Sequence, residues 1–364
     1  MTDDALRRSP LHERHEALGA KFAVFSGWEM PLQYAGVMEE HAAVRERVGV
    51  FDVSHLGKSV VTGPGARGFV DECLTNSLDK IEPGQAQYTM CCDESGGVVD
   101  DLIVYLRSDE DLLLIPNAAN NAEIVRRLAA AAPEGLQVRN AHDEYAIIAV
   151  QGPSSDEVLT AIGLPVDHDY MSFTEADYGS ARLTVCRTGY TGERGYELVI
   201  PAPDAGPVWD AVLGAGEPVG IAPCGLAARD TLRTEMGYPL HGQDLSPEIT
   251  PNQARAAWAV GWKKPAFWGR DALVAEKEAG PRRRLRGLVA TGRGIPRPGM
   301  AVRIDGTDVG EVTSGTFSPT LRKGIGLALL PPGVADGTIV EVNVRGRAEQ
   351  FEVVRPPFVQ PSTR

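Results

Sequence analysis

Two adjacent aspartates open an apolar strand in the first third of the chain. Asp100 and Asp101 follow the sequence Gly-Gly-Val-Val at 96–99 and precede the apolar run 102–106. Side chains alternate between the two faces of a strand, so Asp101 is expected on one face and Asp100 on the other. Because an unpaired buried charge is costly, each carboxylate must reach solvent or meet a partner. Taken alone, the pair is better explained as the end of a hairpin with its turn at 94–97, since aspartate is common in turns.

The length and the charge of the chain limit its architecture and its partners. At 364 residues it is too long for one ordinary core, so two or three domains are expected. A net charge of −13 argues against sequence-independent binding of nucleic acid, which needs clustered cations. One basic cluster occurs, at 282–284 with Arg286. We interpret it as a solvated linker, with a docking patch for an acidic partner as the alternative.

Cysteine usage and hydropathy predict a cytoplasmic protein. The five cysteines are scattered without a CxxC pair, which is typical of reduced, buried thiols. No secretory core follows Met1, and no run approaches the roughly twenty apolar residues of a membrane helix. The seven histidines lack metal-ligand spacing and no HExxH occurs, so no metal is expected. Glycine-rich phosphate loops are absent as well.

Strands and helices alternate up to about residue 240. Apolar spacing predicts an amphipathic helix over 37–48, and strands over 112–115 and 146–150. Asn117 or Asn120 is expected to cap the helix that follows the first of these strands. This alternation predicts α+β layers built from ferredoxin-like units.

The pattern changes after about residue 280. Two short apolar runs flank Asp305 and Gly306, which is a strong two-residue hairpin signal. Valines then alternate with polar residues over 340–344. This part of the chain predicts a small all-β domain, either a barrel or a sandwich.

Two further stretches could contribute to a binding site. In 187–198, glycines allow tight turns and tyrosines offer flat surfaces to a planar ligand. Glu197 opens the apolar end of this stretch, so it could share a pocket with Asp101, although a charged hairpin is an equal alternative. In 225–233, Arg229 could pair with a ligand carboxylate, because a guanidinium matches a carboxylate bidentately. The more common case there is a helix start with exposed arginines.

Six short stretches match the motifs of one family in the family's own order. They are FSGWEMP at 25–31, FDVSH at 51–55, GGVVDDLIVY at 96–105, the stretch 187–198, ARD at 228–230 and SGTFSPTL at 314–321. From about residue 11 to residue 358, the chain therefore resembles the aminomethyltransferases (T-proteins) of the glycine cleavage system.

The resemblance implies a fold and its domain limits. We expect an α+β, multidomain chain with two ferredoxin-like domains and a small C-terminal β-barrel around a central folate pocket. The first domain would be discontinuous, over 1–55 and 145–275, with the second inserted over 56–144. The barrel domain would cover 285–364.

The resemblance also implies a reaction and its partners. The family transfers an aminomethyl group from a lipoylated H-protein to tetrahydrofolate, giving methylenetetrahydrofolate, ammonia and the dihydrolipoyl carrier. Tetrahydrofolate is then a co-substrate and the H-protein a partner, with no role for nucleic acid or a membrane.

The family's site residues carry over to positions in this sequence. Its catalytic aspartate is the second of the pair, Asp101, which would hydrogen-bond folate nitrogens and favour positive charge at the reacting methylene. Glu197 matches the pterin-binding glutamate and Arg229 the folate-contacting arginine. Asp100 is expected to be structural. Three further residues match positions that line the pocket: Tyr88, Asn117 and Tyr190.

Some positions depart from the family's pattern, although none of them is Asp101, Glu197 or Arg229. Leu56 stands where methionine is frequent, Gln253 and Arg255 replace an acidic residue and a glycine, and Val359 replaces a tyrosine. These departures affect the detail of the pocket.

Other functions use the same fold. A folate-dependent demethylase is the enzymatic alternative, and a folate-binding regulatory protein without catalysis is the other. A related tRNA-modification protein carries K-G-C-Y-x-G-Q-E where this chain has RTGYTGE at 187–193. Fused oxidoreductases need a flavin domain, for which 364 residues leave no room. Asp101 together with Glu197 and Arg229 favours an active enzyme.

Overall fold

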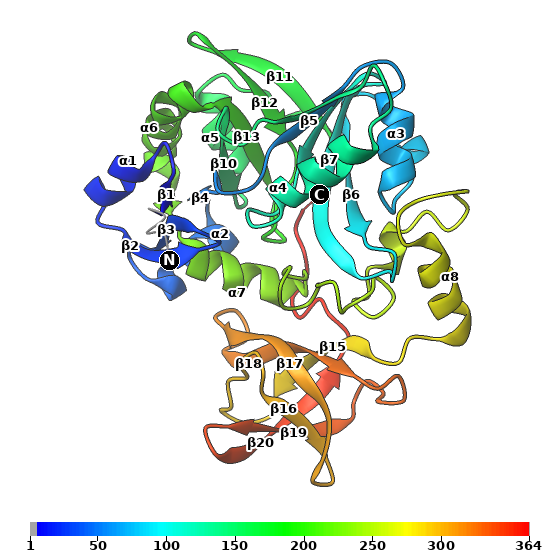
Figure 1. Ribbon diagram of the computed structural model, residues 1–364. Helices are drawn as coiled ribbons and strands as arrows, with labels where there is room; N and C mark the ends of the chain where they lie inside the picture. Colours follow the sequence, from blue (N-terminus) through cyan, green and yellow to red (C-terminus); the bar gives the residue numbers. More distant parts are fainter. Residues whose placement is uncertain (1–5, 364) are drawn as a thin grey trace.

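The computed structural model describes residues 6–363 of the chain. Two α+β layers lie side by side, and a β-barrel packs beneath them (Figure 1). Helix α7 (Leu226–Met236) runs between the α+β part and the barrel and contacts barrel strand β17. The mixed layers and the closed barrel confirm the predicted fold class.

A small sheet and two helices begin the described chain. They are β1 (Arg7–Arg8), α1 (His12–Ala17), β2 (Lys21–Phe25), β3 (Trp28–Gln33) and α2 (Val37–Glu46). The sheet has the order β1-β3-β2. Helix α2 confirms the helix predicted over 37–48. Its apolar stripe buries Ala43 and Val44, and on the same side His41 donates to or accepts from threonine hydroxyls of α7 and of the barrel.

A six-stranded sheet forms the first α+β layer, in the order β11-β12-β13-β10-β4-β14. Its strands are β4 (Gly49–Asp52), β10 (Tyr145–Gln151), β11 (Phe173–Tyr178), β12 (Ala181–Cys186), β13 (Gly195–Pro201) and β14 (Ala222–Pro223). Its helical elements are α5 (Ser155–Ala161), η2 (Ala202–Asp204), α6 (Ala205–Gly216) and η3 (Glu217–Val219). Trp209 and Val212 of α6 pack with Ile148 and Leu198 in one hydrophobic core on a face of this sheet.

A five-stranded antiparallel sheet forms the second layer, in the order β6-β7-β8-β5-β9. Its strands are β5 (Ser59–Thr62), β6 (Gln85–Cys92), β7 (Val98–Ser108), β8 (Asp111–Ile115) and β9 (Gln137–Asn140). Its helical elements are α3 (Ala66–Cys73), η1 (Leu78–Lys80) and α4 (Asn121–Ala131). All of these elements lie between β4 and β10 in the sequence. The domain limits at 56 and 144 stay a prediction.

The inner faces of the two sheets share one hydrophobic cluster. Tyr105 and Leu113 of the second sheet lie in it with Ile147 and Val199 of the first. The two layers are therefore joined by buried apolar contacts, which fixes how strands β7 and β13 face each other.

The C-terminal part is a closed barrel in the order β15-β18-β17-β16-β19-β20. Its strands are β15 (Arg284–Ala290), β16 (Ala301–Ile304), β17 (Thr307–Ser318), β18 (Lys323–Leu330), β19 (Ile339–Val344) and β20 (Arg347–Val354). Closure leaves no free sheet edge. Asp305 and Gly306 both have positive φ, 50° and 79°, as a two-residue hairpin turn requires. The predicted hairpin is confirmed.

The remaining elements connect the layers to the barrel. Between α7 and the barrel come η4 (Ala257–Ala259) and α8 (Arg270–Ala279). Within residues 6–363 no helix is long and apolar enough to cross a membrane, and no three His, Cys, Asp or Glu side chains gather in a way that would hold a metal ion. The five cysteines are free and buried.

Candidate functional site

A cavity of about 660 Å³ lies where the two sheets meet α7 and the barrel. Its walls come from β6, β7, β13, α7, the loops before α4 and after α7, and the first strand of the barrel. All six residues predicted for the site line it: Tyr88, Asp101, Asn117, Tyr190, Glu197 and Arg229. Residues more than a hundred positions apart in the sequence therefore face one space.

Asp101 faces the cavity from strand β7 and is held at both carboxylate oxygens. Tyr88 on the neighbouring strand β6 donates its hydroxyl to Oδ2 at 3.0 Å, and Asn117 donates Nδ2 to Oδ1 at 2.9 Å. Burial raises the pKa of Asp101, whereas the nearby His241 and the two donors act in the opposite direction. Burial and the Asp101 charge raise the pKa of Tyr88 well above its ordinary value, so Tyr88 stays a donor.

Asp100 points to the opposite side of β7 and is completely buried. It accepts the backbone N–H of Asn117 at 3.0 Å and the side-chain amides of Asn117 and Asn120 at 2.8 and 2.7 Å. Burial, together with repulsion from Asp101, raises the pKa of Asp100 well above its ordinary range. The opposite faces predicted for the pair are thus observed. The hairpin turn predicted at 94–97 is confirmed, since it joins β6 to β7. The two aspartates do not cap it, because both lie inside β7 and are bound by Tyr88, Asn117 and Asn120.

The loop before α4 differs from the helix cap predicted for it. Asn120 occupies the N-cap position, yet its side chain makes no capping bond within the described residues. Its amide instead donates to Asp100 and lies 3.0 Å from His241 Nδ1, while His241 Nε2 lies 3.1 Å from the carbonyl oxygen of Val98. A capping bond would use the Asn120 oxygen as acceptor for a helix N–H, but the bonds of its amide nitrogen to Asp100 and His241 fix the side chain in another orientation.

Glu197 enters the cavity from strand β13. Thr188 donates its hydroxyl to Glu197 Oε2 at 2.6 Å, and the Tyr105 hydroxyl lies 3.0 Å from Thr188 Oγ1. Because Thr188 gives its only hydroxyl proton to Glu197, Tyr105 is the donor in the second bond. This chain of donors orients one oxygen of Glu197. The other oxygen stays available to a ligand that donates hydrogen bonds.

Arg229 lies on α7 opposite Glu197. Its guanidinium carbon is 4.8 Å from the ring centre of Tyr190, a cation–π distance. The buried Nη1 atom has no hydrogen-bond partner among residues 6–363. Burial lowers the pKa of Arg229, although the charge of Glu197 opposes this shift. A buried donor without a partner is costly, so this atom is suited to an acceptor on a ligand.

Aromatic rings form flat walls around these polar groups. Tyr190 stacks on Tyr238 with ring centres 5.7 Å apart and donates its hydroxyl to the Pro239 carbonyl. Tyr88 stacks on Trp258 at 5.3 Å, and Trp258 is 67% exposed, which places it at the mouth. A cavity with flat apolar walls and a few fixed polar groups is suited to a planar heterocycle with donors and acceptors at its edges.

Two family models match most of the chain. The GCVT N-terminal domain matches residues 11–264, and the Glycine cleavage T-protein C-terminal barrel domain matches residues 283–360. The chain belongs to the glycine cleavage T-protein family. Its resemblance in six short motifs is therefore confirmed over the whole fold.

Relatives of this T-protein chain match it almost from end to end. The aminomethyltransferase of Frankia alni is 64% identical over 361 residues, which cover 98% of this chain and 99% of the relative. That of Mycobacterium tuberculosis is 59% identical, covering 99% and 98%. The crystal structure of glycine cleavage system aminomethyltransferase T from Bartonella henselae has a TM-score of 0.93 at 34% identity, covering 98% of this chain and 99% of that one.

Two of the four departures from the T-protein pattern, Leu56 and Arg255, line the cavity. Arg255, where the pattern has glycine, has a φ of 60° and lines the cavity. This left-handed backbone explains why glycine is usual there. Gln253 donates to Glu276 and accepts from Arg283, both at 2.8 Å, so an amide serves both partners. Leu56 lines the cavity as an apolar residue. In the segment that contains Val359, Pro356 reaches the cavity.

Sequence reasoning missed several residues of the T-protein cavity. His241 and Trp258 belong to the connection between α7 and α8, where no regular periodicity pointed to a role. Thr188 and Tyr105 lie in stretches that the sequence had already pointed to. Their contact was not predictable, because it joins β7 of the second sheet to the loop between β12 and β13 of the first. The one signal available was the density of aromatic, glycine and polar residues that follows Gly237.

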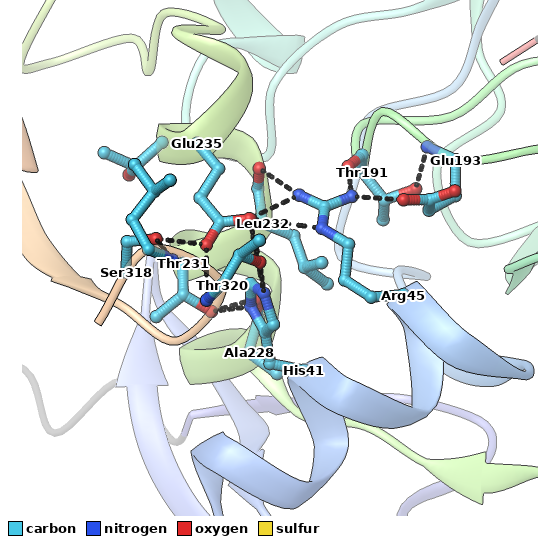
Figure 2. Close-up of polar contacts among 12 residues, drawn as sticks. His41, Arg45, Thr191, Glu193, Ala228, Thr231, Leu232, Glu235, Ser318 and Thr320 are labelled. Carbon is cyan, nitrogen blue, oxygen red and sulfur yellow. Dashed lines mark hydrogen bonds and ion pairs between the residues drawn. The ribbon is translucent and has the colours of Figure 1, made fainter. Parts of the chain in front are cut away.

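A buried polar network holds α7 beside the cavity (Figure 2). Glu235 of α7 pairs with Arg45 of α2 at 2.8 Å and accepts hydroxyls of Ser318 and Thr320 from the barrel at 2.5 and 3.0 Å. Arg45 also pairs with Glu193 at 2.8 Å. The helix that carries Arg229 is thus tied to three other parts of the fold.

Proposed function

We propose that this chain transfers the aminomethyl group of a lipoylated H-protein to tetrahydrofolate, and releases ammonia and methylenetetrahydrofolate. Its T-protein family membership supports the aminomethyltransferase reaction. The observation that carries the proposal is Asp101, a partly buried carboxylate held by two donors on the wall of a cavity lined by Glu197 and Arg229. A cytoplasmic location stays a prediction.

The cavity fits tetrahydrofolate by volume and by chemistry. About 660 Å³ is within the range of pockets that enclose molecules of this size. Glu197 can accept N–H groups from the edge of a pterin, and the stacked tyrosines flank a flat ring. The unpartnered Nη1 of Arg229 can donate to an acceptor further along the molecule. When bound, tetrahydrofolate supplies the two nitrogen atoms that take up the one-carbon unit.

Asp101 is the residue we propose as catalytic. The transfer replaces the bonds of the methylene to sulfur and nitrogen by two bonds to nitrogen, and positive charge develops at the methylene on the way. A carboxylate that is already fixed by Tyr88 and Asn117 can stabilise that charge without reorganising. The apolar walls around Asp101 lower the local dielectric, which strengthens this interaction.

A folate-dependent demethylase and a non-catalytic folate-binding protein are not favoured. The aminomethyltransferase relatives cover the whole chain, and the proposed catalytic carboxylate is present with its donors. A regulatory protein would have no need of a carboxylate fixed at both oxygens on the cavity wall.

The first prediction concerns Asp101→Asn. The variant keeps the size of the side chain and loses its charge, so ammonia release should fall about 100-fold, the scale of losing one preorganised electrostatic contact. Ammonia is measured with an aminomethylated lipoyl carrier and tetrahydrofolate, and folate binding is measured separately by fluorescence. The control is Asp271→Asn, because the Asp271 side chain is fully exposed.

One result would contradict the proposed function, and another would contradict only the role of Asp101. Wild-type protein that binds folate but releases no ammonia from the carrier would point to a demethylase or a binding protein. Full activity in Asp101→Asn would remove Asp101 from the catalytic role and leave the transferase reaction standing.

A further inference from the structure

His55 lines the cavity, and its imidazole ring makes no hydrogen bond to the protein. The residue follows strand β4 after a short loop, and it is 3% exposed. Among residues 6–363, its Nδ1 atom is buried without a partner, and of its polar atoms only the backbone carbonyl takes part in a hydrogen bond. A polar side chain in this position is costly unless a ligand supplies the partner.

The backbone and the ring of His55 are nevertheless held in one place. Lys58 donates Nζ to the Ser54 carbonyl at 2.8 Å, and His142 Nε2 lies 3.1 Å from the His55 carbonyl oxygen. The ring of Phe25 meets the imidazole edge to face, with ring centres 5.3 Å apart. The loop is therefore rigid where His55 faces the cavity, which is typical of a residue that binds a ligand in one orientation.

The surroundings of His55 keep its ring neutral. Burial and the positive charge of Arg229 lower the pKa of His55 to about 3, and the charge of Asp52 opposes this shift. A neutral imidazole carries one N–H group and one lone pair. Because a buried N–H without a partner is rare, we assign the lone pair to the covered Nδ1 and the proton to Nε2. His55 then presents an N–H donor to the cavity.

Arg229 and His55 together make this part of the cavity a donor surface. The guanidinium of Arg229 has only N–H donors, and its Nη1 atom has no partner among the described residues 6–363. Across the cavity, Glu197 offers a carboxylate oxygen to N–H groups. A matching ring needs an oxygen acceptor next to its N–H donors. A pterin has this arrangement, since its oxo group adjoins a ring N–H and an amino group.

We infer that His55 is a specificity-determining residue that donates Nε2–H to the oxo oxygen of the pterin ring, beside Arg229. The inference rests on the proposed function, in which Glu197 takes the neighbouring N–H groups of the ring. Such a bond selects an oxo pterin over an amino pterin, because an amino group would turn its own hydrogens toward Nε2–H. Moving the proton to Nδ1 would not relieve this conflict, since Nδ1–H would be buried without a partner.

The test compares tetrahydrofolate with tetrahydroaminopterin, in which an amino group replaces the oxo oxygen. Anaerobic calorimetry measures the Kd of each. In His55→Leu, the Kd for tetrahydrofolate should rise about tenfold, as expected when a buried acceptor loses one hydrogen bond, whereas the Kd for the amino compound should not rise. His55→Gln, whose amide can donate, should recover part of the loss. His168→Leu is the matched control, because His168 is half-buried and is not part of the cavity lining.

The change in the ratio of the two Kd values decides the role of His55. The wild-type ratio alone does not, because the amino compound also lacks a ring N–H that Glu197 would bind. An unchanged ratio in His55→Leu would overturn the inference. An equal loss for both compounds would overturn it too, since that result indicates a structural role only.

Nitrogen NMR of the wild type provides a test that needs no stable leucine variant. At neutral pH the proton should be on Nε2 of His55, and its signal should move when tetrahydrofolate binds and not when the amino compound binds. The signal is assigned by its absence in His55→Gln. A proton on Nδ1 in the tetrahydrofolate complex would overturn the inference.

Ammonia release from the aminomethylated carrier, measured on the same wild-type preparation, tests the proposed function separately. Full ammonia release with an unchanged Kd ratio in His55→Leu would overturn the role of His55 and leave the transferase reaction standing. Absence of ammonia release, with a Kd ratio that falls in His55→Leu, would overturn the transferase reaction and leave the recognition of the oxo group by His55 standing.

Discussion

Asp100 and Asp101 are neighbours in the sequence and have separate surroundings in the fold. The pleat of β7 directs Asp101 into the cavity and Asp100 into the loop before α4. Asn117 contacts both carboxylates, with its side-chain amide 2.8 Å from Asp100 and 2.9 Å from Asp101. At this scale the site depends on one amide that holds two acids in place, and on burial that makes their charges costly.

Asn117→Ala should change the pH dependence of the reaction. Burial raises the pKa of Asp101, and the Asn117 amide lowers it, so removing the amide raises that pKa further. Because the charged carboxylate is the active form, activity is lost as pH falls through this pKa. The acidic limb of kcat/KM should therefore move to higher pH in the variant. Asn343→Ala, at an exposed position of barrel strand β19, should leave the limb in place, and an unmoved limb in Asn117→Ala would refute the argument.

Glu197→Gln tests the proposed pterin contact. The amide keeps the shape of the side chain but loses the charge that accepts N–H groups, so the KM for tetrahydrofolate should rise about 10- to 100-fold. Steady-state kinetics at saturating carrier measures it. The exposed Glu352→Gln serves as the control. An unchanged KM would show that Glu197 does not bind the co-substrate.

Helix α7 is the element that couples the site to the rest of the fold. It carries Arg229 toward the cavity, and it carries Glu235 toward α2 and the barrel (Figure 2). Arg233 on the same helix is 2% exposed and pairs with Asp244 at 2.9 Å. The sequence predicted exposed arginines at this helix, and that is wrong for Arg233, because the barrel and the following loop cover it.

Glu235→Gln should destabilise the protein. Breaking a buried ion pair by removing one charge costs about 3–5 kcal/mol of the free energy of unfolding, because Arg45 keeps its charge without its partner. Urea unfolding at pH 7 measures the change, with the exposed Glu217→Gln as the control. A loss below about 1 kcal/mol would mean that Arg45 is satisfied by Glu193 alone.

The same variant should alter the pH dependence of stability. Burial alone would raise the pKa of Glu235, but hydrogen bonds from His41 and Ser318 and the charge of Arg45 lower it to about 2, from an ordinary value of 4.5. A carboxylate with a lowered pKa adds to the free energy of unfolding. This contribution is fully present above pH 4.5 and is lost as the pH falls toward 2. The gap between wild type and Glu235→Gln should therefore narrow between pH 4.5 and pH 2.

At the scale of the whole molecule, the cavity exists because separate layers approach closely. Gly97, in the turn before β7, lies against the backbone of Pro247, and a Cβ at Gly97 would come 1.8 Å from the Pro247 carbonyl oxygen. Gly237 ends α7 with a φ of 65° beneath Pro356 of the C-terminal segment. These contacts set the distance between β7, α7 and the barrel, and hence the width of the cavity.

Gly97→Ala should therefore damage both stability and activity. The clash is with backbone, which cannot move aside cheaply, so the free energy of unfolding should fall by about 1–3 kcal/mol and kcat should drop as β7 shifts. Thermal unfolding and ammonia release measure the two effects. Gly68→Ala is the matched control: it lies in helix α3 with no atom near the added methyl, so it should be neutral or slightly stabilising. Equal behaviour of the two variants would contradict this account of the interface.

The sequence by itself determined the elements, the barrel and the family. Apolar periodicity predicted α2, β8 and β10, and the signal at Asp305 and Gly306 predicted the barrel hairpin, because these patterns are local. Alternation along β7 correctly separated Asp100 from Asp101. Motifs in a fixed order then indicated the family and the six residues that line the cavity.

Only the tertiary structure decided which partners those residues meet. The contact of Asn120 with Asp100 and His241 and the orientation of Glu197 by Thr188 and Tyr105 both join segments that are distant in the sequence. Local sequence patterns carry no information on such pairs. The pairs form because a buried charge or donor is costly without a partner, and here the partner lies in another layer of the fold. The chemistry of the site is therefore present in the sequence as residues, and it becomes specific only through the packing of two sheets, one helix and a barrel.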